Sequence, residues 1–518
     1  MAGEEQEKTA TAIKEDSLNP IIPLTINAIH VVNQEGMALN IIDITAGFRL
    51  FESITKKFIT GELIITDGVN MLKYYRFTGQ EYVRISFQHG TPESDAPIID
   101  KTFRVYKLSR QERPSAVAQT YQLHLCDPTM FVANTTRTSK VYRGSYSDMI
   151  RQVFIDDMKQ HESLLQIDDG QGAEKTENNQ FISPNWKAST LIDYFTEHAD
   201  SGIKDTAWRN SYFFYQTLGG VDQKESFHFE NMDDMCAPDQ DIKVLSFYPD
   251  ASAGEGNRRD LILSVSKPQV FNTIRATATG AYASRSITYD PVRKLDSDEY
   301  YNIEESFDRS GAAGHVADGA VVTPLIRGSS VLSEDIERGL STMDSVNDEV
   351  PEVRPMNRWN NQAPNKQHDN FVVYDYNTNH DFDHKSDITS GEVFQGHKVK
   401  NSSKLERNGL FEVLEQNRII AVCSFRTDIS VGDIIQLNIP EPERANPSGE
   451  SNKDKINDDK YLIVDLALTV NLQQAVGGYS GEMQIECVKE SYAAKIKKEE
   501  LEKALKSSAP PSTEDLCG

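Results

Sequence analysis

The chain has 518 residues and a formal net charge of -25, from 79 acidic and 54 basic residues. That length predicts three or four domains, and the acidic balance with no basic stripe argues against binding nucleic acid through its phosphates. The first residues are acidic and lack an apolar run, and no stretch reaches the length needed to span a bilayer. We therefore expect a protein that folds in a cytoplasm without membrane insertion.

The five cysteines are far apart and odd in number, with no CxxC pair. They predict neither a disulfide framework nor a zinc site, and we interpret them as small buried side chains, with Cys517 exposed near the end.

Residues 1–19 are polar, and we predict that they are disordered. From residue 20 to 138, short segments with alternating polarity follow one another, separated by Gly, Asp and Pro. Val83, Ile85 and Phe87 alternate with polar neighbours, as residues on one face of a half-buried antiparallel strand do. Several such strands in about 110 residues predict a small antiparallel β-barrel.

Residues 139–241 have a different pattern. Ser147 is a candidate N-cap for a helix whose apolar residues run from Met149 to Met158, and a second helix is predicted from about Trp186. Two aromatic segments then predict a hairpin. We interpret this part as an inserted α+β domain.

Strand patterning resumes over 242–305 and again over 405–493, which together predict a second barrel. Between them, 306–404 has few apolar residues, and we expect a long irregular extension. A charged helix and a disordered tail are predicted over 494–518. The fold class is thus mainly β with an α+β insert: two small antiparallel barrels, the inserted domain and the extension.

The two barrel patterns also form a coarse internal repeat. A chain with two similar barrels can build a trimeric ring with six quasi-equivalent positions. Two unrelated β domains remain the alternative at this point.

Two segments resemble baseplate hub proteins of contractile-tailed phages. LFESITKKFITGELIITDGVNMLKYYRFTGQEYVRISF is similar to the first tube-like barrel of that family, and SFRTDISVGDIIQLNIP with KYLIVDLALTVNL is similar to the second. The order barrel, α+β insert, barrel is also similar to the hub half of secretion-system spike proteins. The extension has no counterpart, and no spike-like β-helix repeat follows the second barrel.

The resemblance implies a structural virion protein of the tail baseplate, assembled in the host cytoplasm, that is not an enzyme and has no cofactor. Its implied partners are two further copies in a homotrimer, the tail tube protein, a central spike or tail lysozyme, the tape-measure protein and baseplate wedge proteins. DNA would only pass through the lumen during genome ejection, and the net charge would keep an acidic lumen from holding it. The alternatives are a tail-associated cell-wall hydrolase and a carbohydrate-binding tail protein.

No catalytic, cofactor-binding or metal-binding residue is predicted. The run from Asp375 to Ser386 alternates acidic and amide residues, but His380 and Ser386 replace the Gly and Glu that a calcium loop needs. His380 and His384 lie four apart in a sequence that does not favour a helix, so a solvated loop is the preferred interpretation over a metal site.

Two carboxylate clusters also fail as glycosidase sites, because their polar surroundings would leave every member ionised. They are Asp168 with Asp169, and Asp296, Asp298 and Glu299. An aromatic run, Tyr212 to Tyr215, is interpreted as strand core with half of its rings facing inward, rather than as a binding platform.

Overall fold

The computed structural model describes the larger part of the chain. The described residues are 24–90, 97–115, 117–167, 179–201, 210–219, 226–236, 242–247, 260–269, 272–281, 283–290, 295–302, 316, 372–375, 402–440, 457–475 and 478–489. The expectations for residues 1–19, for most of 306–404 and for 494–518 lie outside these ranges, as do His380, His384, Asp168, Asp169 and Cys517. Among the described helices none is long and apolar enough to cross a membrane.

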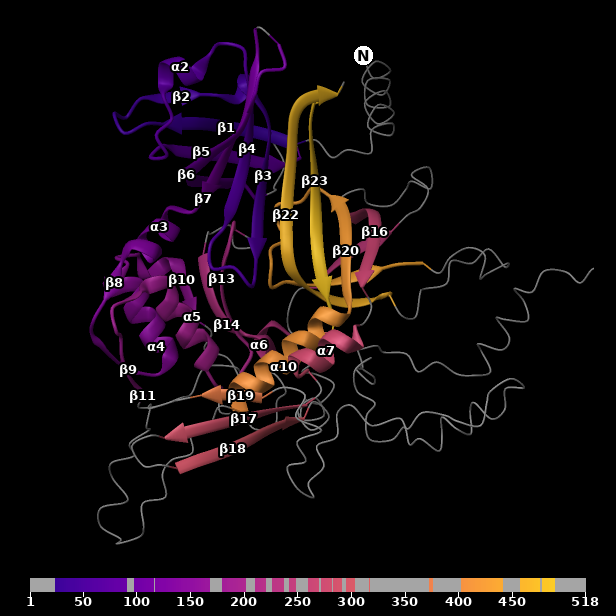
Figure 1. The fold of residues 1–518 in the computed structure, drawn as a ribbon. Coiled ribbons are helices and arrows are strands. Elements are labelled where there is room, and N and C mark those ends of the chain that lie inside the picture. Colours follow the sequence, from indigo (N-terminus) through magenta and orange to yellow (C-terminus); the bar gives the residue numbers. More distant parts are fainter. Residues whose placement is uncertain are drawn as a thin grey trace, which may run out of the picture.

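The predicted mainly-β fold is confirmed, and one large sheet dominates it (Figure 1). Its thirteen described strands are β1 (Leu24–Val32), β2 (Ala38–Asn40), β3 (Thr45–Ser53), β4 (Thr60–Asp67), β5 (Tyr82–His89), β6 (Ile99–Glu112), β7 (Gln119–Cys126), β15 (Lys243–Phe247), β16 (Leu261–Gln269), β20 (Arg418–Ser424), β21 (Ile434–Asn438), β22 (Asp459–Ala475) and β23 (Gly478–Val488). The alternating apolar residues of these strands fill one continuous hydrophobic core. Val83, Ile85 and Phe87 are fully buried, as their alternation predicts.

The sheet closes on itself twice. β1 pairs with β5 along eight residue pairs, which closes a first barrel of β1, β5, β6, β7, β4, β3, β22 and β23. β22 also pairs with β23, which closes a second barrel of β23, β20, β16, β15, β21 and β22. The sequence pattern suggested two barrels, but it did not reveal that they have two strands in common. Closing a sheet into a barrel removes exposed strand edges.

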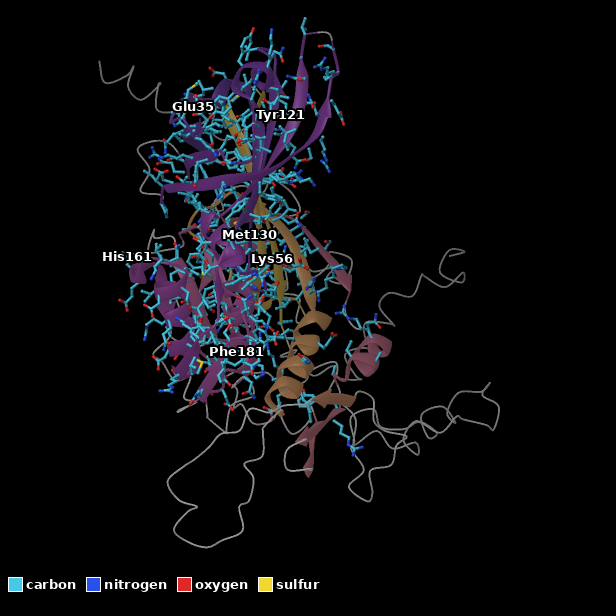
Figure 2. All side chains as sticks on the ribbon, turned by 60° about the vertical axis from the view of Figure 1, so that its left-hand side comes forward. Glu35, Lys56, Tyr121, Met130, His161 and Phe181 are labelled. Carbon is cyan, nitrogen blue, oxygen red and sulfur yellow. The ribbon has the colours of Figure 1, made fainter. Side chains whose placement is uncertain are left out.

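The α+β part has a core of its own, built from apolar residues of its helices and its small sheets. Its elements are α3 (Pro128–Thr135), β8 (Arg137–Thr138), β9 (Val141–Gly144), α4 (Tyr146–Arg151), the π-helical segment η2 (Gln152–Asp157), η3 (Glu162–Leu164), β10 (Leu165–Ile167), β11 (Asn179–Ile182), β12 (Trp186–Lys187), α5 (Ala188–His198), β13 (Tyr212–Thr217), β14 (Ser226–Asn231) and α6 (Met232–Met235). In Figure 2, Tyr121 lies in the first barrel, and Phe181 lies well below it in this second core. The predicted hairpin is β13 paired with β14.

The first predicted helix starts two residues earlier than expected. Ser145, and not Ser147, is the N-cap: its hydroxyl accepts from the backbone N–H of Asp148, whose carboxylate accepts in return from the backbone N–H of Ser145. This reciprocal capping box outcompetes a single hydroxyl two residues further on, because it satisfies two donors of the helix end at once.

The remaining described elements lie around the barrels. They are η1 (Ile42–Ile44), α2 (Met71–Tyr75), α7 (Thr273–Thr279), β17 (Ala283–Asp290), β18 (Leu295–Asn302), β19 (Val372–Asp375) and α10 (Ser402–Gln416). β17, β18 and β19 form a separate three-stranded sheet, so of the strands expected in the second barrel from 242–305 only β15 and β16 lie in it. The segment Thr273–Thr279, expected as strand, is helical.

The helix α10 was also not predicted. Its three leucines, Leu405, Leu410 and Leu414, are 5% exposed or less, but their spacing of five and four residues places Leu405 and Leu414 on opposite sides of the helix and so gives no apolar stripe in the sequence. The sequence analysis placed the start of strand patterning at 405 and so overlooked this helix. The other limits of the predicted domains stay predictions.

Candidate functional site

The feature that joins the two barrels is the long hairpin of β22 and β23 (Figure 1). The first residues of β22 pair with β21 in the second barrel, whereas Asp465 to Asn471 pair with β3 in the first. The last residues of β23 pair with β20, and Tyr479 near its start pairs with Leu24 of β1. Because each hairpin strand is hydrogen-bonded into both barrels, the barrels cannot turn independently without breaking backbone hydrogen bonds.

One face of the sheet therefore runs without interruption from the second barrel into the first. Residues that pair directly across strands lie on the same face. One row of such pairs crosses eight strands from β16 to β6 and consists of Ser264, Val422, Gln484, Ala467, Phe51, Thr60, Cys126 and Arg104. A second row crosses seven of these strands and consists of Ser424, Glu482, Thr469, Arg49, Glu62, His124 and Lys107. We call this surface of β16, β20, β23, β22, β3, β4, β7 and β6 the shared sheet face.

The opposite surface of the same strands is the hydrophobic core. Leu468 of β22 pairs with Leu50 of β3 and with Met483 of β23, and all three are 2% exposed or less. The shared sheet face is the other side of the pleat and carries a mixture of charged, polar and single apolar residues, of which Gln484, Arg49 and Ile64 are exposed. Because of this alternation the shared sheet face is polar and has no large apolar patch.

The shared sheet face is close to charge balance. Its carboxylates include Glu62, Glu112, Asp465, Glu482 and Glu486, and its cations include Arg49, Arg104, Lys107 and Arg418. Glu486 forms an ion pair of 2.6 Å with Arg418. His124 Nε2 hydrogen-bonds Ser109 Oγ at 2.6 Å, and its other ring nitrogen lies 3.7 Å from Glu62. The chain's net charge of -25 is thus not concentrated on the described part of this face.

At one end of the shared sheet face the α+β part covers it. Cys126 is buried although it points to this side, and the guanidinium of Arg104 lies 4.0 Å from the ring centroid of Phe131 in α3. A cation over an aromatic ring is attracted by the ring quadrupole. The helix α3 therefore covers the shared sheet face where β6 and β7 meet the α+β part.

A glycine lets β3 and β22 approach each other on this surface. A Cβ atom at Gly47 would lie 2.5 Å from the carbonyl oxygen of Val470. Any other residue would push the two strands apart at the point where the hairpin joins the first barrel.

The three parts of the chain meet at a buried carboxylate, Glu52 of β3. Its oxygens accept hydrogen bonds from the backbone N–H of Leu218, just after β13, at 2.8 Å, and from that of Val431, in the second barrel, at 3.2 Å. Burial raises the pKa of Glu52 to about 7, although both hydrogen bonds act in the opposite direction. One side chain thus joins the first barrel, the α+β part and the second barrel.

A buried ion pair makes a second connection. Lys101 Nζ lies 2.8 Å from Asp127 Oδ2, and both side chains are almost fully buried. Gln216 Nε2 of β13 donates to the same carboxylate at 2.7 Å, while its Oε1 accepts from the backbone N–H of Ile59 at 3.1 Å. Burial opposes ionisation of Asp127, but the Lys101 charge and the hydrogen bonds outweigh it and lower the pKa of Asp127 to about 2.

Acidic groups also surround Tyr215 of β13. Its hydroxyl donates to Glu230 at 2.8 Å, and Glu230 in turn lies 3.0 Å from His228 Nδ1. Burial first, and then Glu230, Asp433 and Glu52, raise the pKa of Tyr215 well above its usual value. Burial likewise raises the pKa of Asp433, despite the ammonium of Lys243 3.3 Å away. All of these groups have hydrogen-bonding partners and lie inside the junction, so they hold the parts together.

The aromatic run Tyr212 to Tyr215 belongs to this junction. The expectation that half of its rings face inward was wrong, because all four are 5% exposed or less. Phe213 and Tyr215 pack into the core of the barrels, while Tyr212 and Phe214 pack into the core of the α+β part. The strand is a shared wall between two cores, which alternation alone could not distinguish from a half-exposed strand.

Of the carboxylate clusters considered from the sequence, the structure describes the backbone of one. Asp296, Asp298 and Glu299 lie on β18, opposite Tyr289, Ile287 and Ser286 of β17. Cys126, Cys236, Cys423 and Cys487 are buried, as expected. Within the described residues, no group of three or more His, Cys, Asp or Glu side chains is arranged to hold a metal ion.

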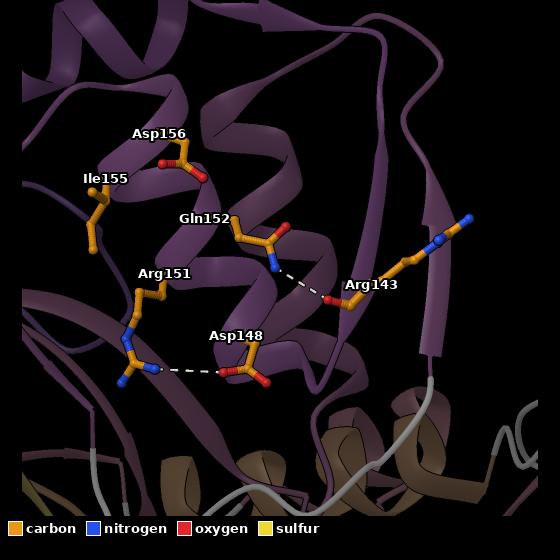
Figure 3. Close-up of a pocket in the computed structure, with 6 residues that line it drawn as sticks. All are labelled: Arg143, Asp148, Arg151, Gln152, Ile155 and Asp156. Atoms are coloured by element: carbon orange, nitrogen blue, oxygen red, sulfur yellow. Dashed lines mark hydrogen bonds and ion pairs between the residues drawn. The ribbon is translucent and has the colours of Figure 1, made fainter.

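A shallow pocket of about 290 Å³ lies on the α+β part, where the π-helical segment follows α4 (Figure 3). Arg143, Arg151, Asp148 and Asp156 contribute both signs of charge to its lining. Arg151 lies 3.5 Å from Asp148, and Gln152 donates to the backbone carbonyl of Arg143. Its polar groups thus pair with one another and do not converge on the pocket, unlike those of a ligand site.

No protein-family model matches the sequence, and no curated protein sequence matches it significantly. Solved structures do show similarity. A tail protein from Neisseria meningitidis MC58 has a TM-score of 0.45 at 7% identity, covering 89% of this chain and 96% of the other. The 43 kDa tail protein of prophage MuSo2 from Shewanella oneidensis has a TM-score of 0.43 at 8% identity, with coverage of 89% and 98%. The Escherichia coli c3393 protein, a component of the type VI secretion system, has a TM-score of 0.37 at 8% identity, with coverage of 92% and 79%.

These solved structures belong to the same classes, phage tails and secretion systems, that the sequence resembles. Their TM-scores below 0.5 and identities below 10% mean that a function for this chain must follow from its own residues.

Proposed function

We propose that the chain is a non-enzymatic structural subunit of a phage tail or related injection machine, and that three copies form a ring around a central channel. The observation that carries the proposal is the shared sheet face. The outer surfaces of the two barrels are continuous through β22 and β23, and we propose that the part of this surface on β23, β22 and β3 faces the channel. A hydrogen-bonded sheet that faces water without an apolar patch is suited to lining a passage that macromolecules must traverse without binding.

The common hairpin also fixes the two barrels of one copy next to each other. Two barrels per copy would present six similar units to a sixfold tail tube while keeping threefold symmetry for a spike.

The charges on the shared sheet face differ from the acidic lumen that we expected from the sequence. With carboxylates and cations nearly in balance on the described face, a channel lined by it would neither attract nor strongly repel a duplex. Any acidity of the lumen would come from other residues of the chain. The tail tube, spike or tail lysozyme, tape-measure and wedge proteins remain the proposed partners, and the virion baseplate remains the proposed location.

Native mass spectrometry of the purified chain tests the proposal. We expect a species of three copies that increases with protein concentration in the micromolar range. A chain that stays monomeric at every concentration, or that forms only dimers, would contradict the ring. The same sample should not clear purified peptidoglycan, and clearing would instead support the cell-wall hydrolase alternative.

A further inference from the structure

The end of the first barrel that points away from the α+β part is formed by three connections. They are the turn at 33–37, the segment 68–81 that contains α2, and the described residues 113–115 and 117–118 between β6 and β7 (Figure 1). The hydroxyl of Tyr75 donates to the carbonyl of Met37 at 3.4 Å, and Gln119 Nε2 donates to Asn70 Oδ1 at 3.3 Å. These contacts hold the three connections together as one surface, which we call the distal end.

The distal end exposes large apolar side chains. Val69, Tyr74 and Val117 are 64%, 76% and 80% exposed, and they rank among the most exposed large apolar residues of the described chain. The ammonium of Lys73 lies 5.2 Å from the ring centroid of Tyr74. Apolar residues gathered at one place on a surface, with a charged rim, are typical of a protein interface.

The rim is basic, in contrast to the chain as a whole. Lys73, Arg76, Arg110 and Arg113 are all exposed, and within the described residues no ion pair joins them to a carboxylate. The exposed carboxylates at this end of the barrel are Glu35, Glu112 and Asp43, which lies beside Thr66 near the end of β4, while Asp67 and Glu81 are buried there. Exposed cations thus outnumber exposed carboxylates by four to three at this end of a chain whose net charge is -25.

Two of these arginines have an unfavourable backbone conformation. Arg76 and Arg110 both have φ of 51°, and Asn70 beside them has φ of 59°. Three of the five non-glycine residues with positive φ in the described chain therefore lie at the distal end. Local structure accounts for all three conformations, because Asn70 and Arg76 cap the two ends of α2 and Arg110 lies at a β-bulge of β6.

We propose that the distal end is a docking surface for an acidic surface of a different protein. The basic rim is complementary to carboxylates, and Val69, Tyr74 and Val117 supply the apolar centre that such an interface buries. A protein fits this surface better than nucleic acid does, since two exposed valines gain nothing from a phosphate backbone and only four cations are available for counterion release. The docking surface is separate from the shared sheet face and does not require the channel.

Site-specific photo-crosslinking tests this surface. A benzophenone amino acid replaces Val117 in the full chain, which is produced in its own host together with the neighbouring genes, and the cells are irradiated. We expect a crosslink to a peptide of another protein in which Asp and Glu outnumber Lys and Arg. In the double variant R110E/R113E the yield should fall at least about tenfold, since two like-charge contacts replace two attractive ones.

The matched control is R143E on the α+β part, which also reverses an exposed arginine but lies away from the distal end. It should leave the crosslink unchanged, and equal melting temperatures would show that all variants fold. A crosslink to nucleic acid, to a second copy of this chain or to a peptide without net negative charge would overturn the proposal, as would the lack of any crosslink. The crosslink at Val117 does not depend on how many copies of the chain form a ring. The crosslinking result therefore stays informative whether or not native mass spectrometry shows three copies.

Discussion

Single buried charges decide how the parts of this molecule are held together. Glu52 and the pair Lys101–Asp127 look in the sequence like ordinary surface charges on alternating strands. The structure places them at less than 4% exposure, with partners far away in the sequence. No local pattern can reveal such partners, because they depend on which strands come together.

Glu52 should make the stability of the chain depend on pH. Its pKa in the folded protein is about 7, above the ordinary value of 4.5, so the folded state binds the proton more tightly than the unfolded state. The contribution of Glu52 is therefore most favourable below about pH 4.5 and is lost as the pH rises to 7, by up to about 3 kcal/mol.

The variant Glu52→Gln cannot titrate, and we expect its stability to fall less than that of the wild type between pH 5 and 7.5. Urea unfolding at a series of pH values measures this difference. Glu35→Gln, at an exposed position, is the control and should follow the wild type. An unchanged pH slope in Glu52→Gln would show that the carboxyl does not titrate in this range.

Lys101→Met should destabilise the chain strongly. It leaves the buried carboxylate of Asp127 without its cation, and the loss of one partner of a buried pair costs about 3–5 kcal/mol. The matched control is Lys57→Met, which removes a more exposed partner of Asp193 and should cost less than about 1 kcal/mol. Equal effects of the two variants in urea unfolding would contradict the structural role of the buried pair.

At the scale of strands and helices, period-two alternation correctly indicated the strands of both barrels, because each of them buries one face. The pattern failed where that condition does not hold. β13 buries both faces between two cores, and α10 has leucines too widely spaced to stand out in a polar sequence. The sequence also could not predict that β22 pairs with strands of both barrels. Alternation shows which side of a strand is buried, but it does not show which strands lie next to it.

The junction of β3 and β22 can be tested through Gly47. In Gly47→Ala the new methyl group would lie 2.5 Å from the Val470 carbonyl oxygen, so the strands must separate, and we expect a loss of about 1–3 kcal/mol. Gly68→Ala is the control, because the nearest atom to its Cβ is 4.0 Å away. Urea unfolding of both variants gives the comparison, and a Gly47→Ala variant as stable as Gly68→Ala would refute the close approach.

For the whole molecule, the sequence indicated the order of barrel, α+β part and barrel, and the mainly-β class. It could not show that the two barrels form one rigid body with a common face, because that property arises from a single hairpin long enough to serve both. The candidate site was for the same reason absent from the sequence analysis: its residues, such as Arg49, Glu62, Thr469 and Gln484, become a surface only through the register of the strands.

The orientation of the shared sheet face in the assembled ring is the most direct test of the proposed function. A cryo-electron microscopy map of the purified oligomer, at a resolution that shows side chains, measures it. We expect threefold symmetry with Gln484, Thr469 and Arg49 of every copy facing a central channel. A map in which these residues face outward, or are covered by a neighbouring copy, would contradict the account.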